Sequence, residues 1–255
     1  MNHTSQFPFL VLAISFVVMW LSARIGAAFR KRRRSLEENE REDFGIIMAA
    51  ILTLLGLIIG FSFSMAITRY DQRKNDEEGE ANAIGTEYLR ANLLPAADAA
   101  RVRTLLRSYV DQRILFYDTS DERELRQIDA ATTQLQTELW SAVQAPAEAQ
   151  PTPLAALAVS GMNDVLNSQG YTQAAWWNRI PVSAWGLMAA IAICCNLLIG
   201  YGAHRGEAKT NLLLILPLVV SISFYLIADI DSPRGGVVRV LPQNLESLSQ
   251  TLHAH

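Results

Sequence analysis

Four long stretches without a charged residue constrain this chain most. They cover residues 7–23, 44–68, 180–203 and 211–228, and the first continues beyond Arg24 to residue 29. About 20 apolar residues in a helix cross the hydrocarbon core of a bilayer, and an arginine near a helix end extends its charge to the headgroups. The sequence therefore predicts four transmembrane helices, at residues 7–29, 44–68, 180–203 and 211–230.

The composition agrees with a membrane protein and excludes two other classes. Half of the residues are hydrophobic and 18% are charged, whereas soluble domains have about a quarter charged residues. A disordered chain would contain far fewer apolar residues. We expect an all-α, multi-pass protein of the cell membrane, which in a bacterium is the inner membrane, with the lipid bilayer as its first partner.

The first span could instead be a cleaved signal peptide. The six residues before it contain no Lys or Arg, whereas a signal peptide begins with a basic segment. The positive charge follows the span, in a basic loop at residues 30–43. This pattern favours an uncleaved anchor whose N-terminus is exported.

Positive charge near the spans also predicts the orientation, because cytoplasmic loops are enriched in Lys and Arg. The loop 30–43 and the loop between the last two spans carry eight such residues, against six that lie close to the spans on the opposite side. The first loop usually weighs most. We therefore expect both termini and residues 69–179 outside the cytoplasm.

Residues 69–179 are hydrophilic but follow helical spacing, which predicts a helical domain inserted between spans two and three. Its first helix should continue span two until Pro95 stops it. Thr119 and Glu122 have the spacing of a capping box at the start of a later helix. The C-terminal tail, residues 231–255, is too short for a domain.

Prolines organise the second half of this segment. Pro146, Pro151 and Pro153 indicate a linker, and Thr152 before Pro153 suits an N-cap and a first helical residue. The helix that follows should end near Gly170. Trp176 and Trp177 then precede the third span, where they suit either the interfacial belt or packing on the middle helices.

Small residues form one face of the second span. Gly56 and Gly60 make a GxxxG pattern, which Ser64 extends. Such residues let helix backbones approach closely in lipid. The pattern favours either self-association around a pore or packing against another span of the same chain.

The exit of the second span is the densest polar part of the sequence, and four residues there are candidate site residues: Arg69, Asp71, Glu80 and Asn82. A solvated helix face is the simpler interpretation. If several copies surround an axis, these residues would line a charged vestibule.

Two further acidic residues, Asp229 and Asp231, end the fourth span. An acid at the edge of a span is costly unless it is solvated or paired. They are either a solvated stop signal or partners of Arg69 or Arg179.

Several function classes lack support. The net charge of −3 gives no basic surface for nucleic acid. The sequence has no phosphate-binding glycine loop, no dinucleotide fingerprint and no His or Cys cluster with zinc spacing. We expect no catalytic residues, no metal and no cofactor, and therefore no enzyme.

The run LGLIIGFSFSMAITRYDQRKNDEEGEANAIGTEYLRANLLP, followed by RVRTLLRSYVDQRI, resembles a bacterial family of uncharacterised four-span proteins called bestrophin-like. The late ADIDSPRGG is similar to the ending of that family. IGFSFSMAITRYD also resembles the end of the second span in true bestrophins, which are pentameric anion channels. The resemblance implies a homo-oligomer for small anions in which Thr53, Leu57 and Phe61 line a hydrophobic neck.

The sequence departs from the bestrophins at three points. The tryptophan pair after the arginine is here Tyr70 and Asp71, and Thr53 is polar at a neck position. Bestrophins also keep the segment after span two in the cytosol, whereas the charge count here places it outside.

The alternative function is a membrane-anchored interaction or sensor module whose middle helices bind a partner. A transporter has less support, because broken or repeated helices are missing, although Pro217 lies in span four.

Overall fold

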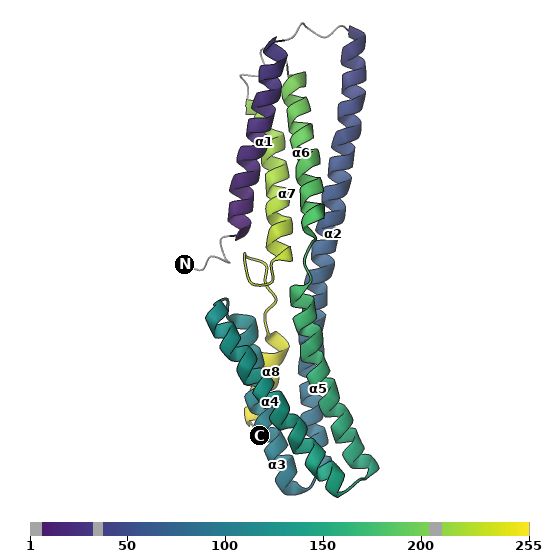
Figure 1. Ribbon diagram of the computed structural model, residues 1–255, viewed down its shortest axis with the longest axis vertical. Helices are drawn as coiled ribbons and strands as arrows, with labels where there is room; N and C mark the ends of the chain where they lie inside the picture. The colour runs from purple at the N-terminus through teal and green to yellow at the C-terminus, as the bar shows by residue number, and fades with distance from the viewer. Residues whose placement is uncertain (1–6, 33–37, 204–210, 255) are drawn as a thin grey trace. The chain divides into compact units, whose positions relative to one another are not determined.

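The structure is a computed structural model that describes residues 7–32, 38–203 and 211–254, and within these ranges it contains helices and no strand. The all-α prediction is confirmed (Figure 1). The helices are α1 (Phe7–Arg32), α2 (Glu38–Arg90), η2 (Ala91–Leu93), α3 (Ala96–Asp118), α4 (Glu122–Ala149), α5 (Pro153–Trp177), α6 (Val182–Gly202), η4 (Asn211–Leu214), α7 (Ile215–Asp231) and α8 (Gln243–Ala254).

The helices divide into two compact units. Among the described residues, the first unit contains those of 7–68 and 179–238, and the second contains those of 69–178 and 239–254. Part of the predicted basic loop, residues 33–37, and the loop at 204–210 lie outside the described residues.

In the first unit, α1, α6 and α7 lie side by side (Figure 1). Two glycines allow α1 and α6 to approach closely. A Cβ added at Gly200 would lie 1.9 Å from the carbonyl oxygen of Ala23, and one added at Gly26 would lie 2.0 Å from that of Leu197. Arg30 donates hydrogen bonds to the carbonyls of Tyr201 (3.0 Å) and Gly202 (2.5 Å) in the last turn of α6.

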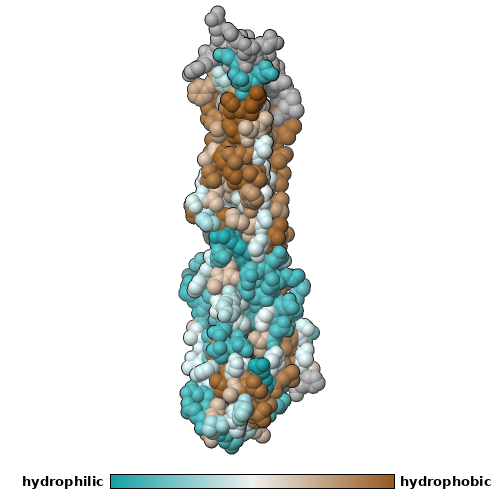
Figure 2. Space-filling model, turned by 90° about the vertical axis from the view of Figure 1, so that its right-hand side faces the viewer, coloured by the Kyte–Doolittle hydropathy of each residue, from teal (hydrophilic) through white to brown (hydrophobic). Residues whose placement is uncertain are grey.

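Among the described residues, length and composition identify three segments that could cross a membrane, Pro8–Arg30, Glu42–Leu93 and Pro153–Gly202. They overlap the first three predicted spans. The fourth predicted span corresponds to η4 and the 17-residue helix α7, and it is not among those three. Figure 2 shows that the face of the first unit in view is mainly hydrophobic, whereas that of the second unit is mainly hydrophilic with a smaller hydrophobic area.

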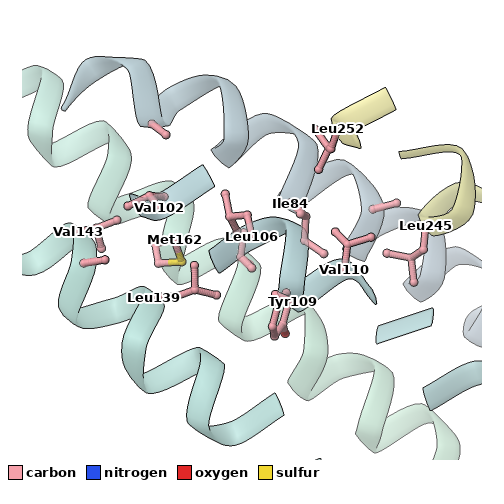
Figure 3. Packing of buried hydrophobic residues seen from close by; sticks show 14 of the residues in the cluster. Ile84, Val102, Leu106, Tyr109, Val110, Leu139, Val143, Met162, Leu245 and Leu252 are labelled. Carbon is pink, nitrogen blue, oxygen red and sulfur yellow. The ribbon is translucent and has the colours of Figure 1, made fainter. Parts of the chain in front are cut away.

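The second unit has its own hydrophobic core, to which α2, α3, α4, α5 and α8 contribute (Figure 3). Apolar residues recur every three or four positions along α3, so one stripe of the helix is buried. This stripe includes Val102, Leu106, Tyr109 and Val110. Leu139 and Val143 of α4 and Met162 of α5 pack against the same cluster. Complete burial of a side chain of this size contributes about 1.5–3 kcal/mol.

The predicted helix boundaries were partly correct. α2 ends at Arg90 and η2 at Leu93, immediately before Leu94 and Pro95, as expected. The predicted capping box was wrong: Asp121 is the N-cap of α4 and accepts from the amides of Arg123 (2.7 Å) and Glu124 (3.4 Å). The Thr119 hydroxyl lies two positions too early and hydrogen-bonds the Glu124 carboxylate instead.

The proline and glycine signals led to one correct and two wrong predictions. Thr152 caps α5 by accepting from the amide of Ala155 (3.0 Å), as predicted. Pro146 lies inside α4 rather than in a linker, and its carbonyl accepts from Gln150 (2.9 Å). α5 continues through Gly170 to Trp177. A mid-helix glycine costs about 1 kcal/mol, and the burial of Thr172 and Trp176 beyond it offsets that cost.

Candidate functional site: the exposed face of the second helix

The first half of α2 has one buried stripe, formed by Leu55, Ser62 and Ala66. At about 100° per residue, Thr53 and Leu57 lie about opposite that stripe. Leu57 is 52% exposed and Phe61 63% exposed. Thr53 is also exposed, and its hydroxyl donates to the Ala49 carbonyl (2.9 Å). The neck candidates therefore belong to a face that the described residues of this chain leave uncovered.

The small residues of α2 also lie on exposed parts of the helix. A Cβ added at Gly56 or Gly60 would meet no atom of the described chain within 4 Å. Ser64 is exposed, and its carbonyl accepts from the Thr68 hydroxyl (3.0 Å). Among the described residues, then, no neighbouring span fills the space beside these two glycines.

The four polar candidates after the span have different environments. Asp71 and Asn82 are exposed, and Arg69 is half-buried. Glu80 is completely buried in the second unit, where it pairs with Arg113 and accepts from the Thr172 hydroxyl (3.1 Å). Glu80 is therefore a structural group of this unit, while Asp71 and Asn82 remain on its surface.

Glu80 is the centre of a buried polar cluster. The Tyr117 hydroxyl donates to it at 3.4 Å, and burial together with this carboxylate raises the pKa of Tyr117. Burial opposes the charge on Arg113, but the Glu80 carboxylate raises the pKa of that guanidinium. Arg113 also lies 4.4 Å from the centre of the Phe116 ring. A paired and hydrogen-bonded charge of this kind is tolerated in a protein interior, whereas an unpaired one is not.

A second buried carboxylate, that of Glu77, was not predicted from the sequence. It accepts hydrogen bonds from the amides of Asn244 and Leu245 (2.9 Å each) and from the Asn244 side chain (2.6 Å). These amides are at the start of α8, where a negative charge is favourable. Leu245 and Leu252 of α8 are buried in the core of the second unit. The α8 part of the tail is thus an integral part of this unit.

The two acids at the end of α7 are buried, so they are not a solvated stop signal. Asp229 accepts from the amides of Val237 and Val238 (2.9 Å each), and Asp231 accepts from the amide of Ile180 (3.1 and 3.2 Å). Gly236 has φ of +80°, and a Cβ there would lie 1.7 Å from Asp229 Oδ1. Only glycine fits this turn without strain.

The tryptophan pair divides between the two interpretations. Trp176 is buried, with its ring 4.9 Å from that of Phe116 and 5.4 Å from that of Tyr117. Trp177 is 74% exposed, as an interfacial residue would be. Within the described ranges, no three His, Cys, Asp or Glu residues are grouped so that they could hold a metal ion.

Comparison with known proteins agrees with an all-α membrane protein. The model of the Bestrophin-like domain matches residues 9–245. The chain therefore belongs to the bestrophin-like family, as the resemblance of its second span predicted.

Solved structures with a similar fold include bacterial bestrophin homologues from Klebsiella pneumoniae. One, phased with zinc, is 16% identical, with a TM-score of 0.62 over 96% of this chain and 95% of that one. A tryptophan-to-alanine variant is 14% identical, with a TM-score of 0.63 over 100% and 97% of the two chains. At this identity the likeness concerns the fold. No curated protein matched the sequence.

Proposed function

We propose that this protein is an oligomeric four-span channel for small anions, in which the second helix of each copy lines a hydrophobic neck. The uncovered face of α2 is the observation that carries this proposal. Leu57 and Phe61 alone would suit lipid, but the same side of the helix contains Thr53, Gly60 and Ser64. Small and polar residues favour contact between helices over contact with acyl chains.

The neck would consist of Thr53, Leu57 and Phe61. They are four residues apart, so successive side chains lie along one side of the helix. A ring of leucine and phenylalanine side chains from several copies would form a constriction that closes by losing its water. Family membership supports self-association, and a pentamer follows from the analogy with bestrophins.

Charge at the mouth of this pathway would tune selectivity. Asp71 lies seven residues after Ser64, which keeps it on the same side of a continuous helix. A ring of carboxylates attracts cations and opposes the entry of anions. Asp71→Asn should therefore shift the reversal potential in a salt gradient toward that of an anion-selective pore. An unchanged reversal potential would exclude Asp71 from the pathway.

Conduction is tested with the purified protein in planar bilayers. Leu57→Ala and Phe61→Ala should change the single-channel current, because they widen the proposed constriction. Leu187→Ala is the matched control, since Leu187 of α6 is 53% exposed, almost as much as Leu57. Silence from an oligomer of verified size would contradict the proposal.

The charge bias of the loops supports an orientation with the second unit outside the cytoplasm. Ala130 is exposed on α4. In a chain whose two native cysteines are replaced, Ala130→Cys should react with an impermeant maleimide added to intact cells. Labelling only after permeabilisation would reverse the orientation.

The alternative, a membrane-anchored module that binds a partner, is favoured by exposed apolar side chains on the second unit. Leu154 is 54% exposed and Leu157 48%, and isolated apolar residues are normal on surfaces whereas groups of them often mark contacts. Leu154→Asp with Leu157→Asp should abolish crosslinking to a partner while leaving the size of the oligomer unchanged. If the double variant crosslinks as the natural chain does, this alternative fails.

A further inference from the structure

A third buried acid of the second unit, Glu87 of α2, is unlike the other two. Glu80 and Glu77 each accept several hydrogen bonds. Glu87 is completely buried, and neither of its carboxylate oxygens has a hydrogen-bond partner in the part of the chain that the structure describes. Burying an ionised carboxylate without partners is costly, so such a group keeps its proton instead.

α2 and α5 approach each other closely at Glu87. A Cβ added at Gly161 of α5 would lie 2.0 Å from Glu87 Oε2 and 2.6 Å from Nη1 of Arg90. Glycine at position 161 is thus what allows the backbone of α5 to approach this carboxyl group. The same contact excludes the water that would solvate the carboxylate.

The charged groups around Glu87 do not compensate for a negative charge on its carboxylate. Arg90, on the same helix, favours the carboxylate, whereas Asp164 of α5 opposes it. Arg90 also lies 3.9 Å from Asp164. On the α3 side, Arg103 and Arg107 lie over the ring of the neighbouring Tyr88.

We propose that Glu87 is a proton-binding site that sets how tightly α5 packs on α2. The neutral carboxyl group permits the contact with Gly161, and release of its proton to solvent weakens that contact. This inference does not depend on conduction, because it concerns the packing of the second unit alone.

The pH range follows from the proton affinity of the packed arrangement. Burial, chiefly, raises the pKa of Glu87 from an ordinary value of 4.5 to about 8. Because the packed arrangement holds the proton more tightly than the open one, the contact is strongest below about pH 4.5. The equilibrium constant that favours the packed arrangement over the open one then falls by up to about tenfold per pH unit until pH reaches about 8. Above that pH it stays constant.

Hydrogen exchange of the full-length protein in lipid nanodiscs tests this inference. After correction for intrinsic exchange, protection of the α5 segment around Gly161 should fall between about pH 5 and about pH 8 and then level off. Glu87→Gln should remove that dependence, because its amide cannot ionise. Glu148→Gln is the control, since Glu148 is an exposed carboxylate of α4, and it should behave as the natural chain does.

Two further measurements apply even if Glu87→Gln does not fold. Asp164→Asn removes a negative charge that raises the pKa of Glu87. The protection of α5 should therefore level off at a lower pH, and the total loss of protection should be smaller. Infrared spectroscopy of the natural chain at neutral pH should show a protonated carboxyl band that disappears when pH is raised well above 8. Identical exchange profiles for the natural chain and Glu87→Gln, or the absence of that band, would overturn the proposal.

Discussion

Close packing takes different forms in the two units of this protein. In the first, α1 and α6 meet backbone to backbone, with the Ala23 carbonyl where a Cβ at position 200 would be. In the second, buried carboxylates hold the helices: Glu80 pairs with Arg113, and Glu77 binds the start of α8. Hydrocarbon gives no hydrophobic drive between spans, so close contact must replace it. We propose that the second unit lies in water, where an apolar core is available and the buried charges add specificity to it.

The comparison also sets α2 apart from the other helices of the first unit. A neighbouring backbone occupies the space where a Cβ at Gly26 or Gly200 would lie, whereas the space beside Gly56 and Gly60 is empty of atoms of the described chain. The glycines of α1 and α6 thus allow helices within the chain to pack closely, whereas those of α2 remain available for contact with another molecule. Assembly of several copies is the use that we propose.

Breaking the buried ion pair should have the largest effect. Arg113→Met leaves the Glu80 carboxylate buried without its charge partner, which should cost about 3–5 kcal/mol. Thermal unfolding of the detergent-solubilised protein measures the loss. Adding Glu80→Gln to this variant should restore part of the stability, because no unpaired charge then remains. Equal stability of the single and double variants would show that the charge is not what matters.

A matched pair of glycine substitutions tests the contrast between the spans. Gly200→Ala should destabilise the first unit by about 1–3 kcal/mol, because the new Cβ meets the Ala23 backbone. Gly60→Ala should leave the fold intact and change only the assembly, measured as subunit number by native mass spectrometry. If Gly60→Ala lowers the unfolding temperature as much as Gly200→Ala does, the glycines of α2 pack within the chain after all.

The smallest expected effect concerns the attachment of α8. Glu77→Ala removes an acceptor for two amides at the start of the helix, which should cost about 0.5–2 kcal/mol. Faster hydrogen exchange in residues 243–254 would report it. Ser249→Ala is the control, because its exposed hydrogen bond to Asp111 contributes little. Equal exchange in the two variants would mean that the buried leucines alone hold α8.

Patterns that depend on spacing were readable from the sequence, and those that depend on tertiary contact were not. The all-helical fold, the stop at Pro95 and the cap at Thr152 follow from local chemistry, and all three are present. The continuation of α5 through Gly170 depends on the burial of Trp176 against α3, which no local signal shows.

The candidate site divides in the same way. The exposed face of α2 follows from helical spacing, because residues four apart, such as Thr53 and Leu57, lie on one side of a helix. Glu80, Glu77 and Glu87 belong to one charged run in the sequence, and only the packing of α3, α5 and α8 distinguishes their roles. Leu245, Leu248 and Leu252 in the tail do have helical spacing, and this signal could have identified α8.

A structure of the assembled protein in lipid, viewed along its symmetry axis, tests the central claim most directly. We predict an oligomer in which Thr53, Leu57 and Phe61 of every copy face a common central pathway. A monomer, or an oligomer in which this face of α2 is turned toward the acyl chains, would contradict the claim.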